Sequence, residues 1–97
     1  MATATKVRKT KDGSGTIYKL EPALVVEKGT VEYVIYSYIP LRDIADGFLV
    51  FPQITTLVAS VPTDKGFGQR PSLFARHYEH KKLTARQALK LIGYTLS

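Results

Sequence analysis

Residues 30–39, TVEYVIYSYI, are the strongest strand signal in this chain of 97 residues. In an extended strand, successive side chains point to opposite faces of the sheet. One face then carries Val31, Tyr33, Ile35 and Ile39, and the other carries Val34, Tyr36 and Tyr38. Both faces are largely apolar. The pattern therefore predicts a central strand that is covered on two sides, or a strand whose tyrosine-bearing face binds a partner.

Shorter strand patterns lie before and after this segment. Pro22 interrupts the pattern nearest to it, and because proline has no N–H for a strand ladder, we expect a bulge or an edge position there. Lys28-Gly29 predicts a tight turn, since glycine adopts positive φ freely. The remaining patterns predict strands over residues 16–20, 23–27, 48–51 and 54–61, with a polar or helical turn over 40–47 and a glycine-containing loop over 63–70.

From Pro71 onward the apolar spacing changes to a helical period. Thr84 and Gln87 have the spacing of a capping box, which places a helix start at Thr84. Gly93 suits the left-handed position just after a helix end. The apolar stripe that predicts an earlier helix consists of Leu73, Phe74, His77 and Tyr78. We therefore expect one or two C-terminal helices, with a short strand over residues 94–97.

Strands followed by helices predict an α+β domain with an antiparallel sheet of about four strands. Residues 16–97 are long enough for one small core, and the apolar fraction of 44% is ordinary for a globular chain. Residues 1–15 lack periodicity and end in Gly13-Ser14-Gly15. They are predicted to be a flexible basic arm.

Composition excludes several classes of protein. The chain has no cysteine, which rules out disulfides, thiolate metal sites and a cysteine nucleophile. No apolar run approaches the roughly 20 residues of a membrane-spanning helix. The basic N-terminus is not followed by the apolar stretch of a secretory signal. These features predict a cytoplasmic protein with no membrane association.

Charge is segregated along the chain. Residues 1–12 have net charge +3, residues 13–64 net −3, and residues 65–97 net +6. Basic segments at both ends are typical of surfaces that meet polyanions. The residues predicted to contact nucleic acid are Lys6, Arg8, Lys9, Lys11, Lys65, Phe67, Arg70, Arg76, Lys81, Lys82, Arg86 and Lys90.

Two local patterns support that prediction. Lys82, Arg86 and Lys90 recur every four residues, so they would form one stripe on a continuous helix. Residues 65–68, KGFG, resemble the opening of the ribonucleoprotein octamer of RNA-recognition domains and the KGFG of cold-shock domains, where an exposed aromatic stacks on a base. The resemblance covers four residues, and Pro71 breaks the strand that the family pattern needs. Phe67 therefore either stacks on a base or packs against the core.

Catalysis and metal binding find little support in the sequence. His77 and His80 have a spacing that can bring two imidazoles to one metal, but a zinc site needs a further ligand and no third histidine or cysteine exists. The serines lack a nucleophile context, and Asp43 and Asp46 have no partner histidine. We expect no cofactor, no metal and no enzymatic activity.

Two functional hypotheses remain. The first is a small non-catalytic protein that contacts nucleic acid mainly through phosphates, using the basic arm and the basic C-terminal helical region. The second is a protein–protein interaction module, such as a phage-type accessory, assembly or inhibitor protein. It would use the strand at 30–39, with Tyr33, Tyr36 and Tyr38 as its interface.

Overall fold

The computed structural model describes residues 2–11, 13–39, 42–43, 50–51, 54–79 and 81–97. The described part is built mainly from strands, with one short helix, α1. The elements are β1 (Thr3–Lys9), β2 (Gly15–Val26), β3 (Gly29–Ile39), β4 (Arg42–Asp43), β5 (Val50–Phe51), β6 (Ile54–Thr63), β7 (Gly66–Gln69), β8 (Ala75–Glu79), α1 (Ala85–Leu91) and β9 (Thr95–Leu96).

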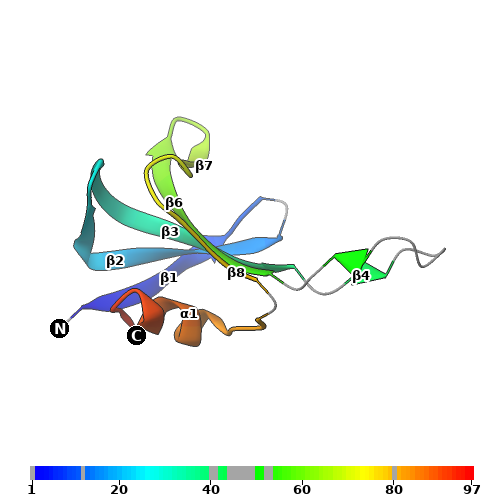
Figure 1. Ribbon diagram of the computed structural model, residues 1–97. Coiled ribbons are helices and arrows are strands. Elements are labelled where there is room, and N and C mark those ends of the chain that lie inside the picture. Colours follow the sequence, from blue (N-terminus) through cyan, green and yellow to red (C-terminus); the bar gives the residue numbers. More distant parts are fainter. Residues whose placement is uncertain (1, 12, 40–41, 44–49, 52–53, 80) are drawn as a thin grey trace.

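Seven strands form one twisted sheet in the order β7-β6-β3-β2-β1-β9, with β8 also pairing with β6 (Figure 1). The pairs along this sheet are antiparallel except β1 with β9, which is parallel. β3 lies between β2 and β6, so the segment with the strongest strand pattern is central, as predicted. β4 and β5 pair separately as a two-stranded sheet.

The predicted α+β architecture, four strands followed by one or two helices, is therefore wrong. The main error concerns the stretch from Pro71, which was predicted to be helical. It forms a turn followed by β8, whose five residues pair with Ile54–Val58 of β6. A short apolar pattern fits either a helix or a strand. Here the unpaired edge of β6 supplies backbone hydrogen-bond partners for an extended segment, and this tertiary pairing overrides the local pattern.

The predicted flexible arm is also wrong for most of its length. β1 pairs with β2 from Thr3↔Glu21 to Lys9↔Thr16, with a bulge between Lys6 and Arg8. Ala4 is fully buried in the core, and Thr95 and Ser97 donate backbone hydrogen bonds to Ala2 and Ala4. The arm has one large aliphatic residue, Val7, and no alternating pattern, so its sequence shows little sign of a strand that is held by its backbone.

The core lies between one face of the sheet and α1, which Figure 1 shows beneath the sheet. Ala88 and Leu89 of α1 are fully buried, and Tyr94 after the helix is almost so. The hydroxyl of Tyr36 on β3 donates to the carbonyl of Leu83, which ties the segment before α1 to the sheet. The buried core cluster is Ala4, Tyr18, Leu20, Val31, Val34, Leu57, Ala59, Phe74, Ala88, Leu89 and Tyr94.

The capping box at the start of α1 is confirmed. The Thr84 hydroxyl accepts a hydrogen bond from the Gln87 backbone N–H at 3.2 Å, and the Gln87 side chain accepts one from the Thr84 N–H at 3.0 Å. Gly93 has φ +93°, and Tyr94 donates its N–H to the Leu89 carbonyl, which completes a Schellman ending. The two ends of the helix were therefore readable from sequence.

Several smaller predictions are also confirmed. The pairing of β2 with β3 shifts register between Lys19 and Leu24, which places a bulge around Pro22. Gly29 has φ +148° where the chain turns from β2 into β3. β9 is the predicted terminal strand.

The predicted loop over 63–70 instead forms the β6–β7 hairpin. Most of the predicted turn over 40–47, half of the strand over 48–51 and His80 lie outside the described residues.

Candidate functional site

The sheet has a second face, opposite α1. Arg8 pairs with Ile17, Ile17 with Ile35, and Ile35 with Val58, so these residues form a row across β1, β2, β3 and β6. Ile17 and Ile35 are 2% and 5% exposed but do not belong to the core cluster under α1. They form a second, smaller apolar floor on this face.

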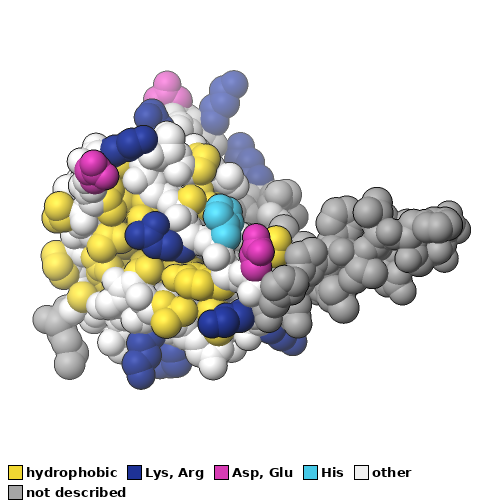
Figure 2. Space-filling model, in the orientation of Figure 1, with side chains coloured by type: hydrophobic (Ala, Val, Ile, Leu, Met, Phe, Trp, Pro, Cys, Tyr) yellow, Lys and Arg dark blue, Asp and Glu magenta, His cyan; other side chains and the backbone are white. Residues whose placement is uncertain are grey.

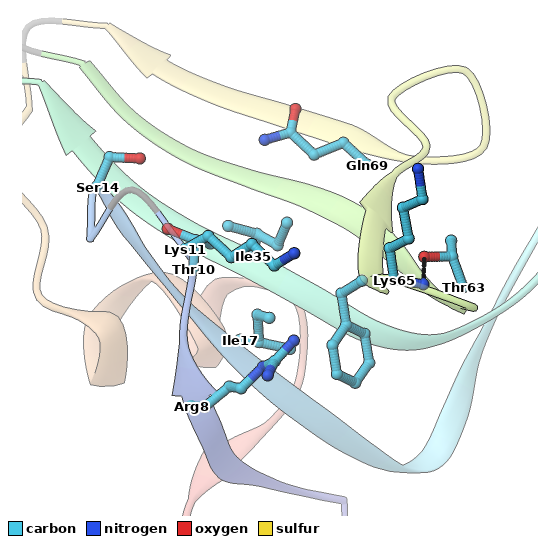
Figure 3. A pocket seen from close by; sticks show the side chains of 10 residues that line it. Arg8, Thr10, Lys11, Ser14, Ile17, Ile35, Thr63, Lys65 and Gln69 are labelled. Carbon is cyan, nitrogen blue, oxygen red and sulfur yellow. Dashed lines mark hydrogen bonds between the residues drawn. The ribbon is translucent and has the colours of Figure 1, made fainter.

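An open groove of about 360 Å³ lies over this floor (Figure 3). Its walls come from the end of β1 with the β1–β2 turn, and from the β6–β7 hairpin. We call it the basic groove, because three of its lining residues are cations and none of the described lining residues is an acid. It is lined by Arg8, Thr10, Lys11, Ser14, Ile17, Ile35, Thr63, Lys65, Phe67 and Gln69.

Phe67 is held at the wall of the basic groove by two aromatic contacts. Its ring meets Tyr33 of β3 at 4.9 Å between centroids and an interplanar angle of 62°, an edge-to-face arrangement. The Arg8 guanidinium lies 5.5 Å from the Phe67 centroid, within cation–π range. Phe67 is half-buried. Of the two roles that the sequence left open, the structure places Phe67 against neighbouring side chains, with part of the ring exposed to the groove.

The Arg8 guanidinium also lies close to the hairpin backbone at Gly66. A Cβ added at Gly66 would lie 2.7 Å from a guanidinium nitrogen of Arg8, and its φ of +126° is unfavourable for residues with a side chain. The glycine in KGFG therefore has a local structural reason, which is its positive φ, and the end of the Arg8 side chain lies against it.

Hydrogen bonds hold the two turns beside the basic groove. Thr10 and Gly15 exchange backbone and side-chain hydrogen bonds across the β1–β2 turn, including Gly15 N–H to the Thr10 hydroxyl at 3.1 Å. The Lys65 N–H donates to the Thr63 hydroxyl at 3.3 Å, and that hydroxyl donates to the Gly66 carbonyl at 3.2 Å. These bonds fix the backbones that carry Lys11 and Lys65, whose side chains are exposed.

The cations of the basic groove are not neutralised within the described part of the chain. Among the described residues the ion pair is Lys19 with Glu21, at 3.8 Å between mostly exposed side chains. Arg8, Lys11 and Lys65 form none. Their positive charge is therefore presented to solvent, where it can meet an anion.

The structure thus brings together only part of the predicted nucleic-acid set. Arg8, Lys11, Lys65 and Phe67 come from separate segments and meet at the basic groove. The others do not line it. Lys6 and Lys9 are exposed on β1, Arg70 follows β7, Arg76 lies on β8, Lys81 and Lys82 precede α1, and Arg86 and Lys90 are exposed on α1. The predicted stripe of Lys82, Arg86 and Lys90 is broken, because α1 begins after Lys82.

The three tyrosines of β3 do not form one surface. Tyr33 lies on the face of the basic groove, whereas Tyr36 and Tyr38 point to the other face, as strand alternation requires. Tyr36 packs on the core and bonds Leu83, and the Lys82 ammonium lies 5.8 Å from the Tyr38 ring centroid. Burial raises the pKa of Tyr36 above its ordinary value, and the neighbouring Tyr18 and Tyr38 raise it further.

Sequence reasoning missed the floor of the groove and its polar lining. Ile35 shares a face with Tyr33 in the alternation of residues 30–39, so that signal was present. The pairing of Ile17 with Ile35, and the approach of Thr63 and Gln69 from the β6–β7 hairpin, depend on strand order. No sequence pattern identified them.

The described residues hold no group of metal ligands and no membrane-spanning helix. No three histidine, aspartate or glutamate side chains among them lie close enough to hold a metal ion. His77 is exposed on β8. No helix in the described ranges is long and apolar enough to cross a membrane.

Comparison with protein-family models, with curated proteins and with solved structures finds no match to this chain.

Proposed function

We propose that this protein binds nucleic acid through the basic groove, mainly by contacts to phosphates. The observation that supports this proposal is the meeting of Arg8, Lys11 and Lys65, from two separate parts of the chain, around one open groove. None of the three has an ion-pair partner among the described residues. Several unpaired cations spaced along an open groove can each bind a phosphate, and the phosphates of a nucleic acid are spaced along its backbone.

The lining of the basic groove favours contacts to the sugar–phosphate backbone of a nucleic acid. Arg8 can donate two parallel hydrogen bonds to one phosphate, and the lysines add two mobile point charges. The half-buried ring of Phe67 and the apolar floor beneath it offer a surface for a sugar or a base. The Arg8 guanidinium lies over one face of the Phe67 ring, so a base that stacks on that face must displace it.

The helix was the other basic surface predicted from sequence, and it supports this function less well. Arg86 and Lys90 are exposed on α1, and neither lines the basic groove. Lys90 also lies in the last turn, where a cation is favourable for the helix itself. If nucleic acid binds in the basic groove, its affinity should depend on the lysines of the groove; if it binds on α1, its affinity should depend on Arg86 and Lys90.

A matched pair of double variants separates them. Binding to a labelled single-stranded DNA, an RNA of the same sequence and the DNA duplex is measured by fluorescence anisotropy over a series of salt concentrations. Lys11→Glu with Lys65→Glu should weaken binding strongly. The salt slope should fall by about 1.4 for single strands and about 1.8 for duplex DNA, since two phosphate contacts are lost. Arg86→Glu with Lys90→Glu reverses the same amount of charge on α1 and should have a much smaller effect.

The outcomes are distinct. If the unmodified protein shows no salt-dependent binding to any of the three nucleic acids at low ionic strength, the proposed function is wrong. If binding occurs but the helix variant weakens it more than the groove variant, nucleic acid is the partner and the basic groove is not the site.

A further inference from the structure

The basic groove is lined by apolar groups as well as by cations. Ile17 and Ile35 lie in its floor, and the half-buried ring of Phe67 lies at its wall. Contact with these groups does not favour phosphates, because a charged oxygen loses its hydration against an apolar surface. The flat aromatic face of a nucleic-acid base can cover them. In a duplex those faces are stacked on neighbouring bases, so only an unpaired base can present its face to the groove.

The size of the basic groove also suits a single nucleotide better than a duplex. Its volume of about 360 Å³ lies near the lower end of the range of roughly 300–1,000 Å³ for sites that hold drug-sized ligands. The β1–β2 turn and the β6–β7 hairpin lie on either side of the floor (Figure 3). A duplex resting on these two walls would meet the exposed Lys11 and Lys65, but not the buried isoleucines between them.

The cations of the basic groove are few for strong duplex binding. Three of its described lining residues are cations, whereas a protein that makes roughly 6–10 phosphate contacts with a duplex needs a broad basic surface. On the side of the molecule seen in Figure 2, lysine and arginine side chains lie in small separate groups among hydrophobic and uncharged side chains. The described residues on that side therefore give a duplex no continuous basic stripe to follow.

We propose that the basic groove selects single-stranded nucleic acid and holds one unpaired base against Phe67, an inference that rests on the function proposed above. The base takes the place of the Arg8 guanidinium, which lies 5.5 Å from the Phe67 ring centroid. Both are flat groups that stack on aromatic rings. Arg8 is exposed and has no ion-pair partner in the described part of the chain, so its guanidinium can turn to a phosphate beside the stacked base. Lys11 and Lys65 then bind phosphates from opposite walls.

This mode of binding depends little on base sequence. Stacking of a base on an aromatic ring is stronger than a cation–π contact at an exposed site, so exchange of the Arg8 guanidinium for a base favours the complex. Every base has an aromatic face, and single-stranded DNA and RNA share both these faces and the phosphates. We therefore expect the groove to bind either kind of strand.

The test uses a tryptophan at the wall of the groove. The chain contains no tryptophan, so Phe67→Trp introduces a single indole, whose fluorescence reports a base stacked on it. The protein is titrated with a short DNA strand of mixed sequence, an RNA of that sequence and the DNA duplex. Both single strands should quench the indole strongly, and the duplex should leave it nearly unchanged. Tyr78→Trp is the matched control, because Tyr78 packs against the core cluster under α1, and no ligand should quench it.

Affinity gives an independent readout, measured by anisotropy of the labelled nucleic acids at one salt concentration. The native protein should bind the single strands at least tenfold more tightly than the duplex. Phe67→Leu keeps apolar bulk but removes the ring, so it should weaken single-strand binding about tenfold and leave duplex binding unchanged. Lys11→Gln should weaken binding to all three, because each of them carries phosphates. Melting temperatures of the variants check that each is folded.

Failure of this inference differs from failure of the proposed function. Equal affinity for strand and duplex would overturn the selection of an unpaired base but not phosphate binding in the groove. The same conclusion follows if Phe67→Leu binds the strands as tightly as the native protein, or if both tryptophans are quenched alike. Absence of binding to all three nucleic acids at low ionic strength would overturn the proposed function, and this inference with it.

Discussion

The guanidinium of Arg8 lies over the ring of Phe67, 5.5 Å from its centroid, and so joins β1 to the β6–β7 hairpin across the width of the sheet. β1 and β7 are separated in the sheet by β2, β3 and β6. The contact therefore places one of the three cations of the basic groove beside the aromatic ring among its described lining residues. Its energy can be measured directly.

The first prediction concerns this pair. A double-mutant cycle with Arg8→Ala and Phe67→Ala, followed by urea denaturation, should give a coupling free energy of about 0.5–1 kcal/mol, the range for an exposed cation–π contact. Phe67→Leu, which keeps apolar bulk without the ring, is the control for lost packing. A coupling indistinguishable from zero would mean that the two side chains do not interact in solution.

Gly66→Ala should destabilise the protein by about 1–2 kcal/mol, because an alanine is strained at φ +126°. It should also displace the Arg8 guanidinium, which lies 2.7 Å from the position of the new Cβ. Gly13→Ala is the comparison, since Gly13 has φ +75° but no atom within 4 Å of an added Cβ. Gly66→Ala should therefore abolish the coupling between Arg8 and Phe67, whereas Gly13→Ala should preserve it.

Thr84→Ala should lower the free energy of unfolding by about 1 kcal/mol, because it removes the acceptor for the Gln87 N–H. Thr84→Ser keeps that acceptor and should stay within a few tenths of the native value. Denaturant titration of the three proteins compares them. Equal losses in both variants would show that the hydroxyl does not cap α1.

The N-terminal strand should be essential for stability. Deleting residues 1–9 removes β1, exposes the surface that Ala4 buries and frees β9, so the melting temperature should fall sharply or the domain should fail to fold. Replacing Lys6 and Lys9 by glutamine, which removes charge but keeps the strand, should change it little. Amide hydrogen exchange gives an independent readout: N–H groups of β1 that pair with β2 should be protected. Rapid exchange along all of β1 would restore the view of a flexible arm.

Stability should fall at alkaline pH, and Tyr36 should contribute to the loss. Its pKa in the folded protein is raised, chiefly by burial, above the ordinary value near 10. The folded state therefore holds this proton more tightly than the unfolded chain. The resulting stabilisation of the neutral form is present in full below pH 10 and is lost as pH rises through the folded-state pKa. Melting temperatures measured from neutral pH to above pH 10 should decline less steeply in Tyr36→Phe than in the native protein.

Residues that pair locally were readable from the sequence. Thr84 and Gln87 bond to each other within one turn, Gly93 ends the same helix, and Lys28-Gly29 turns the chain between adjacent strands. The alternation of residues 30–39 likewise identified a central strand, because two apolar faces require cover on both sides. Each of these features depends on backbone preference and on neighbours a few residues away.

The errors concern segments whose partners are distant. Residues 3–9 and 75–79 become strands because the edges of β2 and β6 offer unpaired backbone groups, a property of the assembled sheet that no local pattern records. The same holds for the candidate site. Charge segregation marked Arg8, Lys11 and Lys65 as basic, but it marked eight other positions in the same way.

Sequence alone thus determined the central strand, the limits of the helix, the tight turns and the excess of positive charge, since these follow from side-chain chemistry and short-range geometry. Tertiary structure alone decided which cations share a groove, which face of the sheet stays open and which apolar side chains are left exposed. The physical reason is strand order: it places residues far apart in the chain on one surface, and it is fixed by backbone pairing across the whole sheet.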